Sequence, residues 1–271
     1  MAGMTRTYPQ GVPCWVDLNQ SDLDGAMRFY GGLFGWSSSN AMPPDAPGAY
    51  MIATLDGQDA AALAPGEGGD GWVSYIACDD ADQTAAAIAR AGGTIVDPPE
   101  DAGPGGRAAT CLDPQGAGFR LWQARRRPGA QAVNEPGAWN FSDLATPDAE
   151  QAMRFYRDVF GWVVSPELGA GMVRLPGYGD FLASGPDPDI HRRQEFAPEG
   201  FDDVIAGLSP ADSEARWWIR FAVADRDESA DRARSLGGMV TSVTDTDWTR
   251  EAVIEDPQGA AFIISQLVVP G

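Results

Sequence analysis

The chain has 271 residues, 44% of them hydrophobic and 10% aromatic, enough to bury two ordinary cores without disulfide or metal staples. Its 39 acidic residues outnumber its 19 basic ones, and the net charge of −20 repels nucleic acid and anionic membranes, so neither is expected as a partner. Every basic residue is an arginine, which excludes Schiff-base and lysine general-base chemistry.

The three cysteines, Cys14, Cys78 and Cys111, are odd in number and lie among apolar residues of predicted strands. This pattern favours small buried thiols in a reducing compartment. The first residues lack the apolar run of a signal peptide, and no segment approaches membrane-spanning length, so we expect a cytoplasmic location. His191 is the single histidine, so a thiol–imidazole catalytic pair is not expected.

A helical segment occurs twice. Residues 27–36, Met-Arg-Phe-Tyr-Gly-Gly-Leu-Phe-Gly-Trp, return as residues 153–162 with seven of ten positions identical. Ala26, Tyr30 and Phe34 fall at helical spacing and form one apolar face, and the glycine that follows ends the helix. The segment therefore predicts a helix that lies on a sheet. Ser21 is its predicted N-cap in the first copy, and Thr146 in the second.

A turn sequence is duplicated as well, since Asp-Pro-Gln-Gly-Ala at 113–117 returns at 256–260. Its proline and glycine are typical of a tight turn between two strands. The chain is thus predicted to contain two copies of one unit, with domains at 1–127 and 138–271. The residues between them, 128–137, are polar and lack periodicity, as expected for a surface linker.

The same order of elements is predicted four times: strand, helix, then three strands. In the first half we expect strands at 13–18, 36–39, 49–55 and 58–64 with a helix ending at Phe34, then strands at 72–78, 94–96, 107–112 and 118–123 with a helix at 82–91. In the second half we expect a strand at 139–144, a helix after Thr146, a strand at 217–223, a helix at 227–236 and a hairpin of 251–255 and 261–266.

The second half has an insertion. The repeated tryptophans are 36 positions apart in the first half and 55 in the second, and residues 186–215 fill the difference. The spacing of Phe201, Val204, Ile205 and Leu208 predicts one short amphipathic helix there. A lid over a pocket and an elaborated surface loop are both open interpretations of this insertion.

These four βαβββ modules, with their paired helices and paired turns, resemble the vicinal oxygen chelate superfamily, which includes glyoxalase I, extradiol dioxygenases and bleomycin-resistance proteins. The likeness covers both halves nearly end to end and is greatest to tandem-domain members common in actinobacteria. It implies an α+β fold of two glyoxalase-like domains, with curled mixed sheets around clefts. Enzymes of this superfamily hold a divalent metal in the cleft with His and Glu side chains.

The resemblance also places the metal-ligand positions. They fall on Trp15 and Phe141 in the first strands, near Val73 and Trp218 in the fifth strands, and on Arg120 and Ile263 in the last strands. None of these side chains binds a metal in the usual manner, so we expect no metal and no other cofactor. Glyoxalase and dioxygenase chemistry are therefore not expected, although an all-carboxylate site remains an alternative.

Alternation along the strands separates a helix-facing side from a cleft-facing side. The predicted ligand-binding residues on the cleft side are Trp15, Asp17, Tyr75, Arg120, Trp122, Trp139, Phe141, Asp143, Trp218 and Arg220. Asp17 and Asp143 occupy equivalent positions, where a carboxylate would receive a cationic or hydroxyl group of a ligand, act as a general base, or serve a structural role. His191 is either a proton carrier or a solvent-exposed side chain.

Aromatic side chains beside carboxylates favour flat, positively charged ligands. Our first hypothesis is a metal-free protein that binds a small aromatic, cationic or polyketide-like molecule, for sequestration, self-resistance or assistance to a biosynthetic enzyme. Alternatives are a metal-independent enzyme (isomerase, cyclase or hydroxylase component) that uses Asp17, Asp143 or His191, and a non-catalytic scaffold. Whether the protein is an enzyme stays open, with binding alone favoured. Internal duplication makes a monomer sufficient, and a homodimer remains an alternative.

Overall fold

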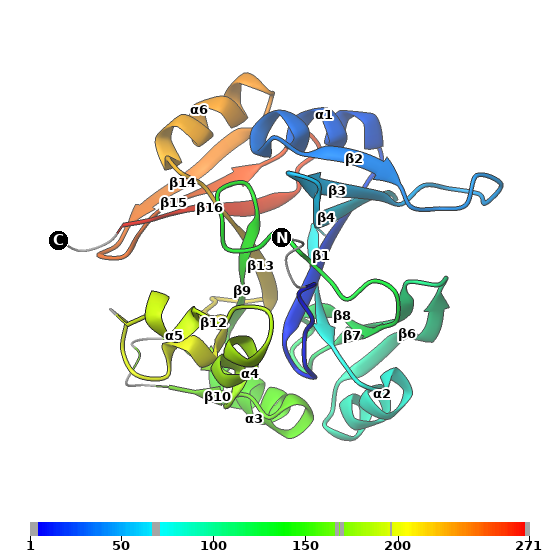
Figure 1. Ribbon diagram of the computed structural model, residues 1–271, viewed down its shortest axis with the longest axis vertical. Coiled ribbons are helices and arrows are strands. Elements are labelled where there is room, and N and C mark those ends of the chain that lie inside the picture. Colours follow the sequence, from blue (N-terminus) through cyan, green and yellow to red (C-terminus); the bar gives the residue numbers. More distant parts are fainter. Residues whose placement is uncertain (1–4, 67–70, 166–167, 169–170, 196, 269–271) are drawn as a thin grey trace. The chain divides into compact units, whose positions relative to one another are not determined.

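The computed structural model of the protein describes residues 5–66, 71–165, 168, 171–195 and 197–268 (Figure 1). The first half contains β1 (Pro13–Gln20), α1 (Leu23–Phe34), β2 (Ser37–Asn40), β3 (Met51–Leu55), β4 (Gln58–Pro65), β5 (Trp72–Ala77), α2 (Ala81–Arg90), β6 (Thr94–Ala102), β7 (Gly106–Leu112) and β8 (Gly118–Ala124).

The second half repeats this order with two added helices. It contains β9 (Trp139–Thr146), α3 (Ala149–Phe160), β10 (Val163–Val164), β11 (Met172–Arg174), α4 (Tyr178–Ser184), α5 (Ile190–Arg193), the 3₁₀ turn η2 (Phe201–Asp203), β12 (Val204–Pro210), β13 (Arg216–Ala222), α6 (Arg226–Ser235), β14 (Met239–Asp245), β15 (Thr249–Glu255) and β16 (Ala261–Leu267). The predicted α+β fold of four βαβββ modules is confirmed.

The strands form two mixed sheets of eight strands each, in the orders β2-β3-β4-β1-β5-β8-β7-β6 and β10-β11-β12-β9-β13-β16-β15-β14. Within each module the first strand pairs in parallel with the fourth, as Asp17 does with Ala62 and Asp143 with Gly207. The other neighbours in a module are antiparallel hairpins. Each half of the sequence thus contributes one sheet.

Compact packing groups the modules differently. One compact unit comprises the described residues of 1–14, 74–129 and 142–217, and the other those of 15–73, 130–141 and 218–271. The first unit therefore combines the second and third modules, and the second unit combines the first and fourth. The strands β1, β5, β9 and β13 each begin in one unit and end in the other.

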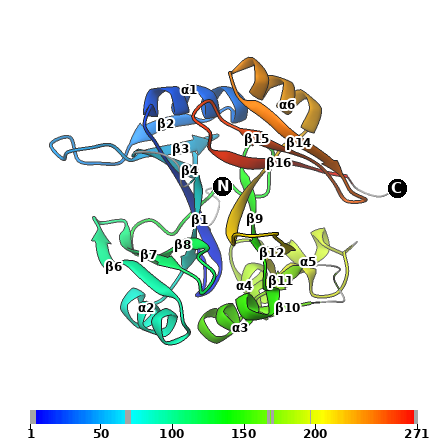
Figure 2. The same cartoon turned by 180° about the vertical axis from the view of Figure 1, so that it is seen from behind.

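In each unit two helices lie side by side on one face of the strands, α2 with α3 and α1 with α6 (Figures 1 and 2). Glycines allow the close approach. A Cβ atom at Gly93 would lie 2.9 Å from the Phe155 ring on α3, and one at Gly238 would lie 2.9 Å from the Phe29 ring on α1. Helix α3 therefore packs against the glycine turn that follows α2, and α1 packs against the glycine turn that follows α6.

The repeated helix supplies aromatic side chains to the core of each unit. On α1, the Phe34 ring lies 4.8 Å from that of Phe221 on β13, a strand of the fourth module. On α3, the Tyr156 ring lies 6.0 Å from that of Phe119 on β8, a strand of the second module. These side chains are almost fully buried. The duplicated motif thus joins modules that are distant in sequence, and burial of rings of this size dominates core energetics.

A buried hydrogen-bond network accompanies each aromatic cluster. Tyr30 donates to Asp256 Oδ2 at 2.8 Å and accepts from Trp72 Nε1 at 3.1 Å. Tyr156 makes the same pair of contacts in the other unit, with Asp113 and Trp217, both at 3.2 Å. Buried polar groups are tolerated when they are paired in this way.

Burial sets the pKa values of this network. It raises the pKa of both tyrosines well above the usual range, and the neighbouring carboxylates Asp256 and Asp113 raise them further. It also raises the pKa of Asp113 itself. The phenols therefore act as neutral hydrogen-bond donors to the turn aspartates.

The turn glutamines hold the start of a helix in the other module. Gln258 accepts from the Asp22 backbone N–H at 2.7 Å and from Ser21 Oγ at 3.0 Å, and its Nε2 donates to the Asp22 carbonyl at 2.9 Å. Gln115 makes the same set of bonds with Thr146 and Asp148. The repeated Asp-Pro-Gln-Gly-Ala turn is therefore a contact between modules.

These bonds correct the predicted helix caps. The N-caps are Asp22 and Asp148, whose carboxylates accept from the backbone N–H groups of Gly25 and Gln151. The hydroxyls of Ser21 and Thr146, which the sequence predicts as caps, donate to the turn glutamines instead. Ser21 and Thr146 thus make a tertiary contact in place of the helix cap that residue preferences predict.

Residues 128–137 are not a surface linker throughout. Ala130 and Ala132 are fully buried, and the Gln131 and Ala132 backbone N–H groups donate to the Asp59 carbonyl at 2.6 and 3.1 Å. A Cβ atom at Gly129, whose φ is +124°, would lie 2.4 Å from the Cys14 carbonyl oxygen. Small residues let this segment pack closely, which polar composition alone did not reveal.

The insertion also differs from its prediction. The added residues lie between β11 and β12 and hold α4 and α5, whose Leu182 and Ile190 are buried in the core. Val204–Pro210 is not part of an amphipathic helix but is strand β12, paired with β9. Over so short a run, the spacing of the apolar residues fits the period of a helix as well as that of a strand. Hydrogen bonding to β9 makes this segment a strand.

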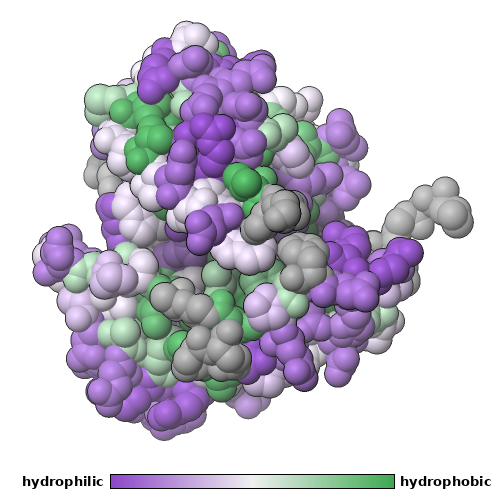
Figure 3. Space-filling view, turned by 90° about the vertical axis from the view of Figure 1, so that its left-hand side faces the viewer, coloured by the Kyte–Doolittle hydropathy of each residue, from purple (hydrophilic) through white to green (hydrophobic). Residues whose placement is uncertain are grey.

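The surface reflects the composition. Hydrophilic side chains cover most of the described surface on the face drawn in Figure 3, with smaller hydrophobic areas between them. None of the helices in the described part of the chain is both long and apolar enough to span a membrane.

We predict that Gln258→Ala and Gln115→Ala each lower the free energy of unfolding by about 1–2 kcal/mol, because each leaves a helix start without its partner. Chemical denaturation followed by circular dichroism measures the change. Gln151→Ala on α3 is the control, and its effect should stay within about 0.5 kcal/mol. Equal effects of all three substitutions would contradict the assigned role of the turn glutamines.

Candidate ligand-binding site

The helix-free face of β13 carries two of the predicted ligand-binding residues. Ile219 and Phe221 are buried toward the helices, whereas Trp218 and Arg220 lie on the opposite face and are half-buried. The alternation predicted for this strand is therefore confirmed. A partly accessible indole two residues from a guanidinium combines a stacking surface with a hydrogen-bond donor.

Arg220 forms an ion pair with Glu251 on β15, and their side chains are 23% and 18% exposed. The register explains the contact, because Arg220 pairs with Ile263 of β16 and Glu251 pairs with Ser265 two residues further along that strand. Glu251 Oε1 also accepts from Thr249 Oγ1 at 2.9 Å and from Ser265 Oγ at 3.4 Å. The result is a cluster on this strand face in which the charges of Arg220 and Glu251 balance and two hydroxyls bind the carboxylate.

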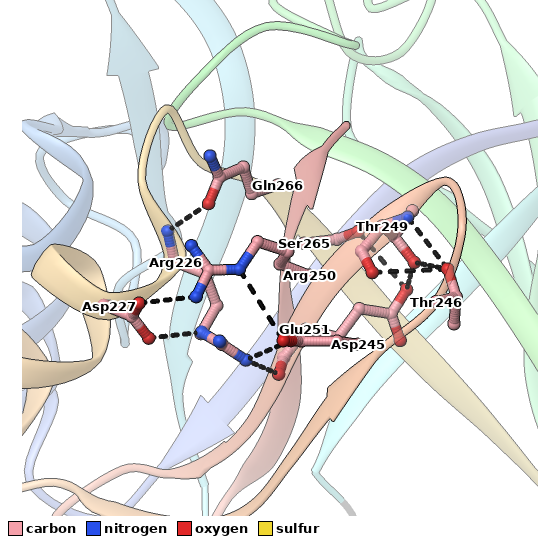
Figure 4. Close-up of polar contacts among 9 residues, drawn as sticks. All are labelled: Arg226, Asp227, Asp245, Thr246, Thr249, Arg250, Glu251, Ser265 and Gln266. Atoms are coloured by element: carbon pink, nitrogen blue, oxygen red, sulfur yellow. Dashed lines mark hydrogen bonds and ion pairs between the residues drawn. The ribbon is translucent and has the colours of Figure 1, made fainter. Parts of the chain in front are cut away.

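A second network fixes the backbone at Glu251 (Figure 4). Arg226 is 3% exposed, and its guanidinium donates to the Glu251 carbonyl at 2.8 Å and to Asp227 at 2.6 Å. Arg250 donates to Asp227 at 2.7 Å, and its hydrogen bond, with that of Arg226, lowers the pKa of the Asp227 carboxyl. The charged side chains of Arg226, Asp227 and Arg250 thus fix the backbone of β15 at Glu251.

Trp15 and Asp17 meet at a residue that sequence reasoning missed. Trp15 Nε1 donates to the Tyr50 hydroxyl at 2.9 Å, and that hydroxyl donates to Asp17 Oδ2 at 3.2 Å. Trp15 and Asp17 are buried, whereas Tyr50 is half-buried. The shared face predicted for Trp15 and Asp17 is consistent with their common partner. No sequence signal marked Tyr50, because it precedes β3, and the sequence does not reveal that only β4 separates β3 from β1.

Tyr75, Arg120 and Trp122 lie together in the other unit. Arg120 Nη1 donates to the Tyr75 hydroxyl at 2.7 Å, and the two residues are register partners on β8 and β5. The Tyr75 and Trp122 rings meet edge to face at 6.2 Å, and Trp122 Nε1 donates to the Arg127 carbonyl at 2.8 Å. Tyr75 is buried, whereas Arg120 and Trp122 are half-buried.

The remaining predicted residues are on β9. Trp139 is buried and its Nε1 donates to the Phe141 carbonyl at 2.9 Å, while Phe141 is half-buried. Asp143 is 7% exposed, and a Cβ atom at its register partner Gly207 would lie 1.8 Å from Oδ1. Only glycine leaves room for this carboxylate.

The structure therefore divides the predicted set between the two units. Six residues belong to the second unit: Trp15, Asp17, Trp139, Phe141, Trp218 and Arg220. Four belong to the first: Tyr75, Arg120, Trp122 and Asp143. The half-buried members, which a ligand reaches most directly, are Arg120, Trp122, Phe141, Trp218 and Arg220.

His191 lies on α5 within the insertion, and its side chain is about half exposed. Its Nδ1 is 2.6 Å from Asp202 Oδ2, and its Nε2 is 3.6 Å from Asp180 Oδ1. Both carboxylates belong to the same insertion. These contacts tie α5 to its neighbours, and the role of His191 as a proton carrier remains a hypothesis.

The side chains present do not fit the divalent ion bound by enzymes that share this fold. Trp15, Phe141, Trp218 and Ile263 stand at the expected ligand positions of the second unit and offer indole, phenyl and alkyl groups, while Arg120 offers a cation. Within the described ranges, no group of three or more His, Cys, Asp or Glu side chains has the arrangement of a metal site. We therefore derive no chemical step through a metal.

Comparison with known proteins agrees with the geometry of the fold. Residues 14–121 match the Glyoxalase/Bleomycin resistance protein/Dioxygenase superfamily, and residues 141–265 match the family described as glyoxalase-like domain. The chain belongs to the glyoxalase/bleomycin resistance protein/dioxygenase superfamily, which we predicted from the repeated motifs under the name vicinal oxygen chelate.

Two curated relatives resemble the chain over nearly its whole length. A putative glyoxylase of Mycobacterium tuberculosis is 35% identical, with 95% of each chain covered. An anthracycline biosynthesis protein of Streptomyces peucetius is 32% identical, with 97% of this chain and 96% of that protein covered.

Solved structures share the fold at low identity. The Mn(II)-bound glyoxalase of Novosphingobium aromaticivorans has a TM-score of 0.61 at 14% identity, covering 95% of this chain and 82% of that one. A homoprotocatechuate dioxygenase of Brevibacterium fuscum has a TM-score of 0.57 at 13% identity, covering 98% and 82%. At such identities the likeness concerns architecture alone.

We predict that Cys14, Cys78 and Cys111 do not react with a thiol reagent in the folded protein and that all three react after unfolding. All are buried, and burial raises the pKa of Cys14 well above its usual range and those of Cys78 and Cys111 to about 12. Since the thiolate is the reactive form, these thiols stay inert near neutral pH. Ellman titration with and without denaturant measures this, and rapid labelling of the native protein would refute it.

Proposed function

We propose that the protein binds a flat aromatic small molecule of the polyketide kind without using a metal, and that it serves natural-product biosynthesis, self-resistance or sequestration. The observation that carries this proposal is the helix-free face of β13, where half-buried Trp218 lies beside Arg220 and its partner Glu251. Phe141 on the neighbouring strand β9 is half-buried as well. The face thus offers rings for stacking and a few charged groups for orientation, as small-molecule sites commonly do.

The relatives support the choice of ligand class. One of them is named an anthracycline biosynthesis protein and aligns with 97% of this chain. Anthracyclines are flat hydroxylated quinones that carry an amino sugar. Their rings suit stacking on indole and phenyl groups, and their positive charge is attracted by a protein of net charge −20. A biosynthetic enzyme would be the protein partner in this role.

A second candidate is a metal-independent enzyme, favoured by the contact between Tyr50 and Asp17. The buried Asp17 carboxylate accepts a hydrogen bond from the Tyr50 phenol, and two groups in this arrangement are able to transfer a proton. Proton transfer on a phenolic or enolic substrate is the reaction class that such a couple would support. Asp17→Asn separates the two candidates, because it should abolish turnover under this second function and leave binding at Trp218 in place.

We predict saturable binding of the anthracycline doxorubicin, measured by isothermal titration calorimetry. Trp218→Ala should weaken it about 5- to 30-fold, because an aromatic contact with a cationic or flat ligand contributes about 1–2 kcal/mol. Trp248→Ala is the matched control, since Trp248 lies exposed in the turn before β15 and should leave the affinity unchanged. Absence of saturable binding, or equal losses in both variants, would overturn the proposal.

We also predict that the protein purified from cells supplied with manganese, iron, nickel and zinc contains much less than one ion per chain. The expected ligand positions lack metal-binding groups, so no site should retain an ion through dialysis. Inductively coupled plasma mass spectrometry measures the content. A stoichiometric ion that is retained and changes the doxorubicin affinity would contradict metal-free binding.

A further inference from the structure

The carboxylate of Glu251 has one engaged and one available oxygen. The ion pair with Arg220 and the hydrogen bonds from Thr249 and Ser265 all go to Oε1. None of these three contacts uses Oε2. The side chain is 18% exposed, so it is held in place yet reachable. A fixed carboxylate oxygen of this kind is ready to accept a hydrogen bond from a ligand.

The fold does not require this charged pair. The equivalent positions in the first half of the chain, on β5 and β7, hold Tyr75 in place of Arg220 and Ala108 in place of Glu251. The same strands pair in the same register there without an ion pair. Partly buried ion pairs contribute little to stability after their desolvation cost, so their presence in one half alone indicates a role other than folding.

The charges of the pair restrict the ligand groups that it accepts. A free ammonium group attracted by Glu251 is repelled by Arg220, and a free carboxylate attracted by Arg220 is repelled by Glu251. A neutral edge that presents a hydroxyl donor next to a carbonyl acceptor satisfies both groups. Phenols and enols beside a carbonyl, as in hydroxyquinones, have this arrangement.

Resting on the proposed function, we propose that the Arg220–Glu251 pair recognises the hydroxy-carbonyl edge of a hydroxyquinone. Glu251 Oε2 accepts from the phenolic hydroxyl, and the Arg220 guanidinium donates to the adjacent carbonyl oxygen. Trp218, two residues along β13 on the same face, stacks on the ring system. The aromatic contact supplies affinity, and the pair selects among aromatic ligands.

The test compares quinizarin, which has a hydroxyl beside each carbonyl, with its dimethyl ether, which keeps the carbonyls and lacks the donors. Calorimetry with the full chain should show that the wild type prefers quinizarin about tenfold or more, as expected for a hydrogen bond to a charged acceptor. In Glu251→Gln this preference should fall below about threefold, because the amide is a weaker acceptor.

A double variant, Arg220→Tyr with Glu251→Ala, places the first-half residues at both positions and should lose the preference in the same way. Glu150→Gln on α3, a residue of the other unit with an exposed side chain, makes the same change of charge and should leave the preference intact. Thermal unfolding of all variants checks that they are folded.

The outcomes separate this inference from the function on which it rests. Equal affinity of the wild type for both quinones, or a preference unchanged in both Glu251→Gln and the double variant, would overturn the recognition role of the pair. If the Trp218-dependent binding of doxorubicin persists in that case, the proposed function stands. If no quinone binds at all, both fall together.

Discussion

Each unit depends on the hydrogen bonds that a hairpin turn of one module makes with a helix of another. Asp256 accepts from the Tyr30 hydroxyl and Gln258 holds the helix start at Asp22, and Asp113 and Gln115 do the same in the other unit. The aromatic side chains of α1 and α3 are positioned by these contacts. The packing of each core and the position of β13, which carries the half-buried Trp218 and Arg220, depend on these contacts between modules.

The two halves of the sequence share these hydrogen bonds between turn and helix, but they differ in the side chains on the corresponding strands. Arg226 replaces Ala81 behind the final hairpin, and Arg220 replaces Tyr75 on the helix-free face. Both changes add charge to the copy that carries Glu251. Besides the inserted helices α4 and α5, the two copies therefore differ in the charged side chains that β13, β15 and the start of α6 present.

The sequence allowed the fold to be predicted because its motifs repeat and each has a local meaning. The alternation along β13 likewise placed Trp218 and Arg220 correctly. Predictions failed where a distant strand decides the outcome. Val204–Pro210 is a strand because it pairs with β9. Tyr50, which precedes β3, and Glu251 on β15 reach the predicted residues of β1 and β13 across one intervening strand. Register between strands leaves no mark on a single sequence, whereas helical repeats and turn motifs do.

Four strands, β1, β5, β9 and β13, begin in one compact unit and finish in the other. Unfolding of either unit would therefore disorder one end of each of these strands, whose other end belongs to the second unit. This continuity of backbone favours concerted loss of structure over stepwise melting. Each half of the sequence supplies one of the two modules in each compact unit, so neither half holds a complete core by itself.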